Sequence, residues 1–132
     1  MPEKRELILK AFVLCDEIRQ RFESPQMDLL GAGLYIIRPE SSPPFPCKQS
    51  FWVYLHLADE NPPGRLNLAI MRGDSGIRYS FRRITVEHSD PLRGFQLAIR
   101  VFDFDFPEPG IYFVELWYDG QWIIDHRLEL IG

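Results

Sequence analysis

The chain lacks the features that would tie it to a metal, a membrane or nucleic acid. Its two cysteines, Cys15 and Cys47, are isolated and have no cysteine or histidine partners at metal-binding spacing, which argues against a zinc site. No apolar run approaches the roughly 18 residues of a membrane span. The net charge is −4 and there is no long run of lysine and arginine, so the basic surface that nucleic acids require is missing. We expect no metal, no cofactor, and no membrane or nucleic-acid partner.

An export signature is also missing. The first 17 residues are charged at both ends, Lys10 interrupts their apolar run, and no small-residue cleavage site follows. These features predict a cytoplasmic protein, in which the thiols of Cys15 and Cys47 stay reduced. Because Cys15 lies in an apolar stretch, we expect it to be a buried thiol and not a reactive one.

What is present is the composition of a β-rich domain. Of the 132 residues, 45% are hydrophobic and 14% aromatic, which is too apolar for disorder and rich in residues that favour strands. Clusters of proline, glycine, aspartate and serine separate runs of strand length. No linker or repeat divides the chain, so we predict a single domain over residues 1–132, built as a β-sandwich or barrel.

Alternating apolar residues mark the individual strands. In the clearest run, 51–58, Trp52, Tyr54 and His56 lie on the face opposite Phe51, Val53, Leu55 and Leu57. Similar alternation covers 65–70, 77–82 and 95–101. After Val101 the phase shifts by one residue, so that Phe102, Phe104 and Phe106 become the apolar set, and this shift predicts a β-bulge.

The last hairpin allows two registers. A two-residue turn at Asp119-Gly120 would pair Tyr118 with Gln121 and Val114 with Asp125. A turn over 117–120 with a bulge at Gly120 would pair Leu116 with Trp122 and Val114 with Ile124. The bulged register separates the faces more cleanly, and a slip of one residue would move every side chain to the other face. We therefore predict the bulged register. Its core face carries Tyr112, Val114, Leu116, Trp122, Ile124, Leu128 and Leu130, and its polar face carries Glu115, Gln121, Asp125, Arg127 and Glu129.

The N-terminal stretch is ambiguous between helix and strand. Apolar residues from Leu7 to Phe22 fall at helical spacing and are flanked by good helix formers. From this pattern alone, residues 7–22 favour a helix.

Several motifs resemble an uncharacterised bacterial family of small single-domain proteins. They are Phe12 to Arg19, Leu29-Leu30-Gly31, Pro44-Phe45-Pro46, Pro109 to Tyr112 and Asp119-Gly120. At Ser24 to Met27 the chain departs from the family, whose members tend to have a Gly-Lys turn there. The resemblance implies an all-β, antiparallel, immunoglobulin-like β-sandwich of about seven to nine strands, with residues 7–15 as a strand. It implies no activity, because the family has none assigned.

The sequence contains no convincing catalytic or metal-binding constellation. His88, Ser89 and Asp90 are triad residue types, but consecutive residues do not converge as a triad, and we interpret them as a turn. Asp103, Asp105 and Glu108 could hold Ca²⁺ as a loop site; we prefer the interpretation in which they face water. We predict that the protein is not an enzyme.

The remaining signal is a set of aromatic and apolar residues outside the predicted core. They are Trp52, Tyr54, His56, Phe113, Trp117 and Ile123. In an immunoglobulin-like order the third strand lies beside the final pair, and taking residues 51–58 as that strand unites the six on one sheet face. Exposed apolar patches commonly mark interfaces. We predict a non-enzymatic structural or interaction domain with a protein partner, in one form a homodimer through this face. The alternative is a carbohydrate- or small-ligand-binding module that uses the same aromatics.

Overall fold

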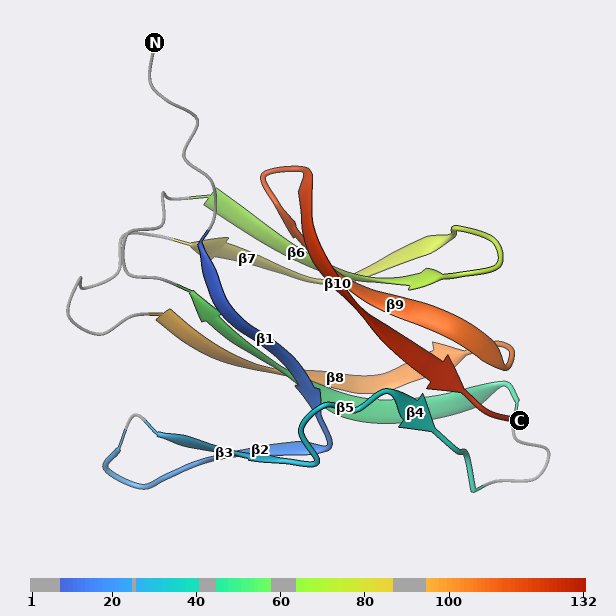
Figure 1. The fold of residues 1–132 in the computed structure, drawn as a ribbon, viewed down its shortest axis with the longest axis horizontal. Coiled ribbons are helices and arrows are strands. Elements are labelled where there is room, and N and C mark those ends of the chain that lie inside the picture. The colour runs from blue at the N-terminus through green and yellow to red at the C-terminus, as the bar shows by residue number, and fades with distance from the viewer. Residues whose placement is uncertain (1–7, 25, 41–44, 58–63, 87–94) are drawn as a thin grey trace, which may run out of the picture.

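The computed structural model describes residues 8–24, 26–40, 45–57, 64–86 and 95–132. Every regular element within these residues is a β-strand. Figure 1 shows two facing sheets with a small hairpin to one side. The strands are β1 (Leu9–Cys15), β2 (Glu17–Gln20), β3 (Met27–Leu30), β4 (Ile36–Ile37), β5 (Cys47–Leu57), β6 (Gly64–Arg72), β7 (Arg78–Val86), β8 (Phe95–Phe106), β9 (Gly110–Tyr118) and β10 (Gln121–Leu130). The prediction of an all-β chain with antiparallel sheets is confirmed. The described residues contain no helix long and apolar enough to cross a membrane.

The two sheets have different sizes. The three-stranded sheet has the order β1-β5-β8 and the five-stranded sheet the order β4-β10-β9-β6-β7. Their pairs are antiparallel except for β4, which runs parallel to β10. The β2–β3 hairpin forms its own two-stranded sheet. After β3 the chain returns to β1, where the Gly33 and Leu34 amides donate to the Leu14 carbonyl, and then crosses to β10.

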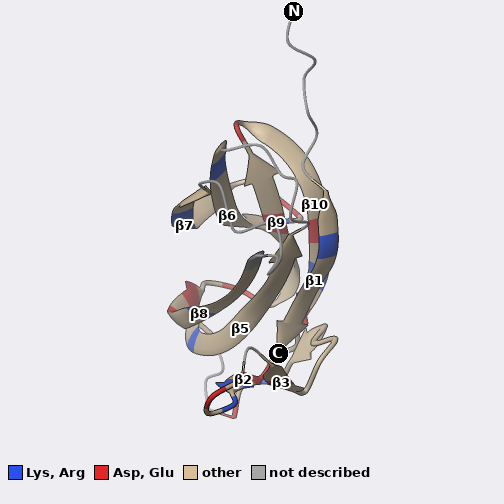
Figure 2. Cartoon of the chain, turned by 90° about the vertical axis from the view of Figure 1, so that its left-hand side faces the viewer, with Lys and Arg blue, Asp and Glu red and all other residues tan. Residues whose placement is uncertain are grey.

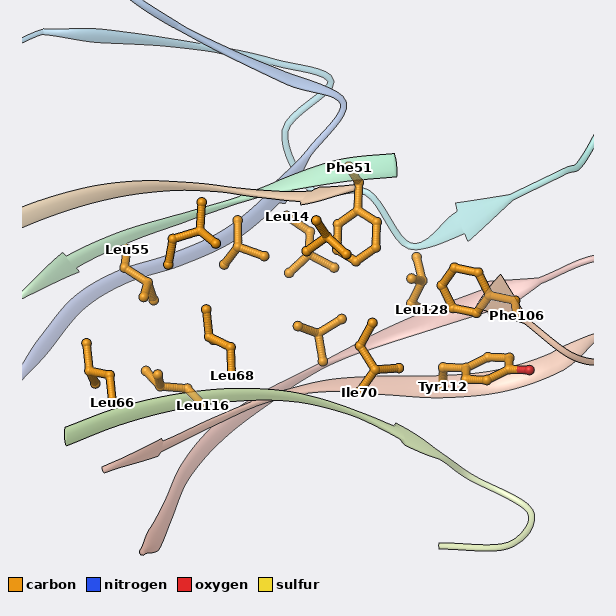
Figure 3. Packing of buried hydrophobic residues seen from close by; sticks show 14 of the residues in the cluster. Leu14, Phe51, Leu55, Leu66, Leu68, Ile70, Phe106, Tyr112, Leu116 and Leu128 are labelled. Atoms are coloured by element: carbon orange, nitrogen blue, oxygen red, sulfur yellow. The ribbon is translucent and has the colours of Figure 1, made fainter. Parts of the chain in front are cut away.

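The core lies between the two sheets, where Figure 3 shows side chains from both layers pointing toward one another. The alternation predicted for 51–58 is confirmed through Leu57, because Phe51, Val53, Leu55 and Leu57 are all buried. From the other sheet, Leu66, Leu68 and Ile70 are buried in the same layer. Each such side chain contributes about 1.5–3 kcal/mol to folding through burial. In the predicted run 77–82, Ile77, which precedes β7, and Tyr79, on that edge strand, are instead exposed.

The helix favoured for residues 7–22 is wrong over the described residues, and the strand implied for residues 7–15 is confirmed over Leu9–Cys15 as β1, residue 7 lying outside the described residues. Pairing decides this difference: β1 lies antiparallel to β5, with Leu14 opposite Val53. The ladder satisfies the backbone and buries Leu14 and Cys15 completely. A tertiary partner thus overrides the local helix propensity.

The β-bulge predicted after Val101 is confirmed. Val101 pairs with Phe51 and Phe104 with Gln49, so Phe102 and Asp103 together oppose the single residue Ser50. Asp103 adopts a φ of 47°, and its amide donates to the Ser50 hydroxyl at 2.9 Å. The placement of Phe102 on the core side is wrong, because Phe102 lies within the bulge and is 64% exposed.

The register chosen for the last hairpin is also wrong, because Leu116 pairs with Ile124 and Val114 with His126. Tyr118 pairs with Gln121, and both Asp119 and Gly120 have positive φ, as a two-residue type I′ turn requires. A bulge does occur, but at Ile123, which separates the Trp122–Trp117 pair from the Ile124–Leu116 pair. The bulge restores the apolar phase of the rest of β10, so the hairpin has both a tight turn and a segregated core face.

Candidate functional site

The six residues predicted to form one interaction face lie on two different sheets. Trp52, Tyr54 and His56 belong to β5 in the three-stranded sheet, whereas Phe113, Trp117 and Ile123 belong to β9 and β10 in the five-stranded sheet. The prediction that the six residues form one patch is therefore wrong. The expected strand neighbour is also wrong, since β6 and not β5 lies beside β9.

The β5 half of the predicted face lies partly beneath the β2–β3 hairpin. Figures 1 and 2 place this hairpin on the side of the three-stranded sheet that faces away from the other sheet, and β2 contacts β5. Trp52, Tyr54 and His56 are each partly buried. The Tyr54 hydroxyl donates to Gln96 Oε1 at 2.7 Å, and burial raises the pKa of Tyr54. The three side chains on β5 therefore make their contacts mainly within the fold.

The outer face of the five-stranded sheet is different, because no described strand lies across it. The β2–β3 hairpin is the one described pair outside the two main sheets, and it lies on the other side. Phe113 and Trp117 project outward as predicted and are partly buried. Trp122, predicted to face the core, pairs with Trp117 and is 51% exposed. Ile123, predicted to face outward, packs against the core because it occupies the bulge. We call Met71, Phe113, Trp117 and Trp122 the outer aromatic patch.

A buried carboxylate lies at the centre of this patch. Glu115 is on the outer face of β9 yet only 2% exposed. Arg78 Nε donates to its Oε1 at 2.8 Å, and Trp117 Nε1 donates to the same oxygen at 3.4 Å. The Arg78 guanidinium also lies 5.4 Å from the centre of the Trp117 ring. A buried charge needs such pairing; Arg78 supplies the opposite charge, and Trp117 adds a hydrogen bond to the same carboxylate.

The acidic cluster considered for calcium is not assembled. Asp103 accepts from the Ser50 hydroxyl, Asp105 lies opposite Lys48, and Glu108 accepts from Arg72 Nη2 at 2.9 Å. In the part of the chain that the structure describes, no group of three or more histidine, cysteine or acidic side chains could hold a metal ion.

The cysteines and histidines have structural surroundings. Cys15 and Cys47 are free and buried, as predicted for Cys15. Burial, with a smaller effect of the Asp16 charge, raises the pKa of Cys15 to about 11, so the thiol is protonated at neutral pH. His126 Nε2 lies 2.8 Å from the Leu34 carbonyl, and its ring stacks on Tyr35. The His88-Ser89-Asp90 sequence lies outside the described residues.

The described surface includes two open hollows that the sequence analysis did not predict. One, of about 420 Å³, is lined by the β2–β3 hairpin and Gln96. Its polar wall includes Arg21, which donates to both carboxylate oxygens of Asp28 and holds the pKa of that carboxyl below its ordinary value. The other, of about 340 Å³, lies on β7 and is lined by Ser80, Phe81, Arg82 and Arg83. No residue of the outer aromatic patch lines either hollow.

Sequence reasoning missed the roles of Glu115, Arg78 and Trp122. Glu115 alternates with Phe113 and Trp117 in the sequence, and two-residue spacing puts all three on one strand face. That pattern was a usable signal that the carboxylate lies between aromatic rings. No local signal identifies Arg78 as its partner, because β6 and β9 bring the two residues together.

Comparison with known proteins does not extend this description. No protein-family model matches the chain, and no curated protein matches it.

Proposed function

We propose that the chain is an immunoglobulin-like interaction domain that self-associates through the outer face of its five-stranded sheet and carries out no catalysis. The observation that supports this most strongly is the outer aromatic patch: Trp122 is half exposed beside Phe113, Trp117 and Met71, and no described strand covers them. Apolar patches of this kind, rimmed by polar residues, commonly mark protein interfaces.

The strand order supports the immunoglobulin-like part of the proposal. The order β1-β5-β8 corresponds to strands A, B and E of that fold, and β10-β9-β6-β7 corresponds to G, F, C and C′. Tyr112 lies near the start of β9, and its hydroxyl donates to the Glu108 carbonyl at 2.7 Å. A tyrosine at this corner that bonds back to the backbone a few residues upstream is a hallmark of such sandwiches.

The size of the face suits a second copy of the chain. Strands β6, β7 and β9 each have 9 residues and β10 has 10. With about 4.8 Å between strands and about 3.4 Å per residue, four such strands present a flat area on the order of 600 Å². Specific interfaces bury at least about 600 Å² per partner, so the face is large enough for a modest dimer.

The two flanks of the face carry opposite net charge. Arg78 and Arg83 share the outer face on β7, while Asp125, Arg127 and Glu129 share it on β10. A two-fold axis parallel to the strands, between β6 and β9, brings β7 of one copy over β10 of the other. Such an isologous contact is self-complementary.

Analytical ultracentrifugation tests the proposal. We expect the wild type to form a dimer whose dissociation constant rises at least about 30-fold in Trp122→Glu, the range for a large aromatic side chain that becomes buried in a protein interface. The matched control is Phe102→Glu, because Phe102 is an exposed aromatic on the other sheet; it should dimerise like the wild type. A wild type that remains monomeric at millimolar concentration would overturn self-association.

The carbohydrate-binding alternative loses its main premise, because the six aromatic and apolar residues form no common platform. Nothing in the described residues favours it over a protein interface.

A further inference from the structure

The β7 strand has an available backbone edge. It is the last strand of the five-stranded sheet, paired along its length with β6, and no described strand pairs with its other side. In an edge strand, alternate residues direct their N–H and C=O groups away from the sheet. The residues Arg78 to Arg83 are exposed, except Phe81, which is partly buried. This edge can accept a further strand without disturbing the core.

The charges of β7 restrict which strand can pair with it. It contains Arg78, Arg82 and Arg83 and no acidic residue, and Figure 2 shows its arginines in blue at the margin of the sheet. Two copies of β7 would set arginines close to arginines, and like charges across strands are destabilising. An acidic strand would instead meet opposite charges at the same positions.

A β-bulge and a surface hollow occur at the same place on the β7 edge. Leu68 pairs with Arg82 and Ala69 with Ser80, so Phe81 is the additional residue of β7. The hollow of about 340 Å³ lined by Ser80 to Arg83 lies at the same place. Arg82 can bind a carboxylate there through charge-assisted hydrogen bonds, whereas Arg83, the next residue of the strand, projects from the opposite sheet face.

We infer that the β7 edge binds an extended acidic peptide segment as an added sixth strand, with one carboxylate bound by Arg82 at the hollow. Main-chain hydrogen bonds to β7 supply the affinity, and the arginines select acidic side chains. This site uses the strand edge, so it is separate from the face proposed for self-association.

The test is a titration of the full chain with an eight-residue peptide of alternating glutamate and threonine. Binding is monitored through the chemical shifts of the backbone amides. We expect the shifts to concentrate in β7. Arg82→Glu should weaken binding about tenfold or more by reversing a contact charge, with Arg82→Gln as an intermediate variant should the first fail to fold. Arg127→Glu makes the same charge change on β10 and should leave the affinity within about threefold.

Two further comparisons decide between specific and diffuse binding. A peptide of glutamate, glycine and proline with equal charge cannot hold a strand, so equally tight binding of that peptide would overturn the inference. Shifts centred away from β7 would overturn it too. The affinity in Trp122→Glu should equal that of the wild type, and a loss there would contradict an edge site, whatever the state of the dimer.

Discussion

At the scale of a single residue, Tyr112 links the hydrophobic core to the turn between β8 and β9. Its ring is buried and packs edge-on against Phe106, with 4.9 Å between ring centres. Its hydroxyl donates to the Glu108 carbonyl across the turn between β8 and β9. The side chain therefore fills the core and at the same time satisfies a backbone group that the turn leaves without a ladder partner.

Tyr112→Phe isolates the hydroxyl contribution, because the ring and its packing remain. Loss of one partly buried hydrogen bond should lower the free energy of unfolding by about 1–2 kcal/mol. Urea denaturation with an unchanged m-value would measure this. Tyr79→Phe, at a tyrosine that is 39% exposed, is the control and should change stability by less than about 0.5 kcal/mol. Equal effects at the two sites would contradict the role given to Tyr112.

At the scale of elements, backbone conformation sets the register of the β9–β10 hairpin. Asp119 has a φ of 48° and Gly120 a φ of 78°, which matches the right-handed strand twist as type I′ turns do. Asp119 also accepts from the Arg65 amide at 2.9 Å and donates its own amide to the Arg65 carbonyl. The turn is therefore tied to β6 as well as to its own hairpin.

Gly120→Ala tests this conformation with no steric complication, because an added Cβ would meet no atom within 4 Å. The positive φ alone should cost about 1–2 kcal/mol of stability. Thermal unfolding should accordingly show a lower midpoint. Asp119→Asn keeps a residue that tolerates positive φ and an oxygen for the Arg65 amide, so we expect a change below about 0.5 kcal/mol. A neutral Gly120→Ala variant would argue for a different turn.

At the scale of the whole molecule, burial couples stability to alkaline pH. The pKa of Cys15 is raised from 9.0 to about 11, mainly by burial, and burial raises the pKa values of Tyr54, Tyr112 and Tyr118 in the same direction. The folded state therefore keeps protons that the unfolded chain releases. This stabilisation is fully present below pH 9 and is lost as pH rises from about 9 to 11.

The expected result is a free energy of unfolding that falls above pH 9, by at most about 1.4 kcal/mol per pH unit for each group. Urea denaturation between pH 7 and 11 would measure it. Burial raises the pKa of Cys47 as well, so Cys15→Ala should reduce the fall between pH 9 and 10, where the two thiols dominate, and leave the contributions of Cys47 and the tyrosines. A slope unchanged by this substitution would contradict the assignment to Cys15.

Local pattern was sufficient to predict many individual strands. The alternation from Phe51 to Leu57 identified the core face of β5, and the phase shift after Val101 identified the bulge in β8. These predictions succeed because strand periodicity and side-chain burial are both expressed over a few neighbouring residues. Even so, the exact bulged residue was missed, since Phe102 is as apolar as the residues around it.

The sequence by itself determined the all-β character, the buried faces of the longer strands and the presence of surplus aromatic residues. Tertiary structure alone decided that Leu9–Cys15 pairs with β5, that β5 and β9 belong to different sheets, and that Arg78 covers Glu115. The physical reason is that burial pattern is local, whereas strand pairing joins residues far apart in the chain. Which aromatics share a surface depends on that pairing, and here it left Phe113, Trp117 and Trp122 on the uncovered face.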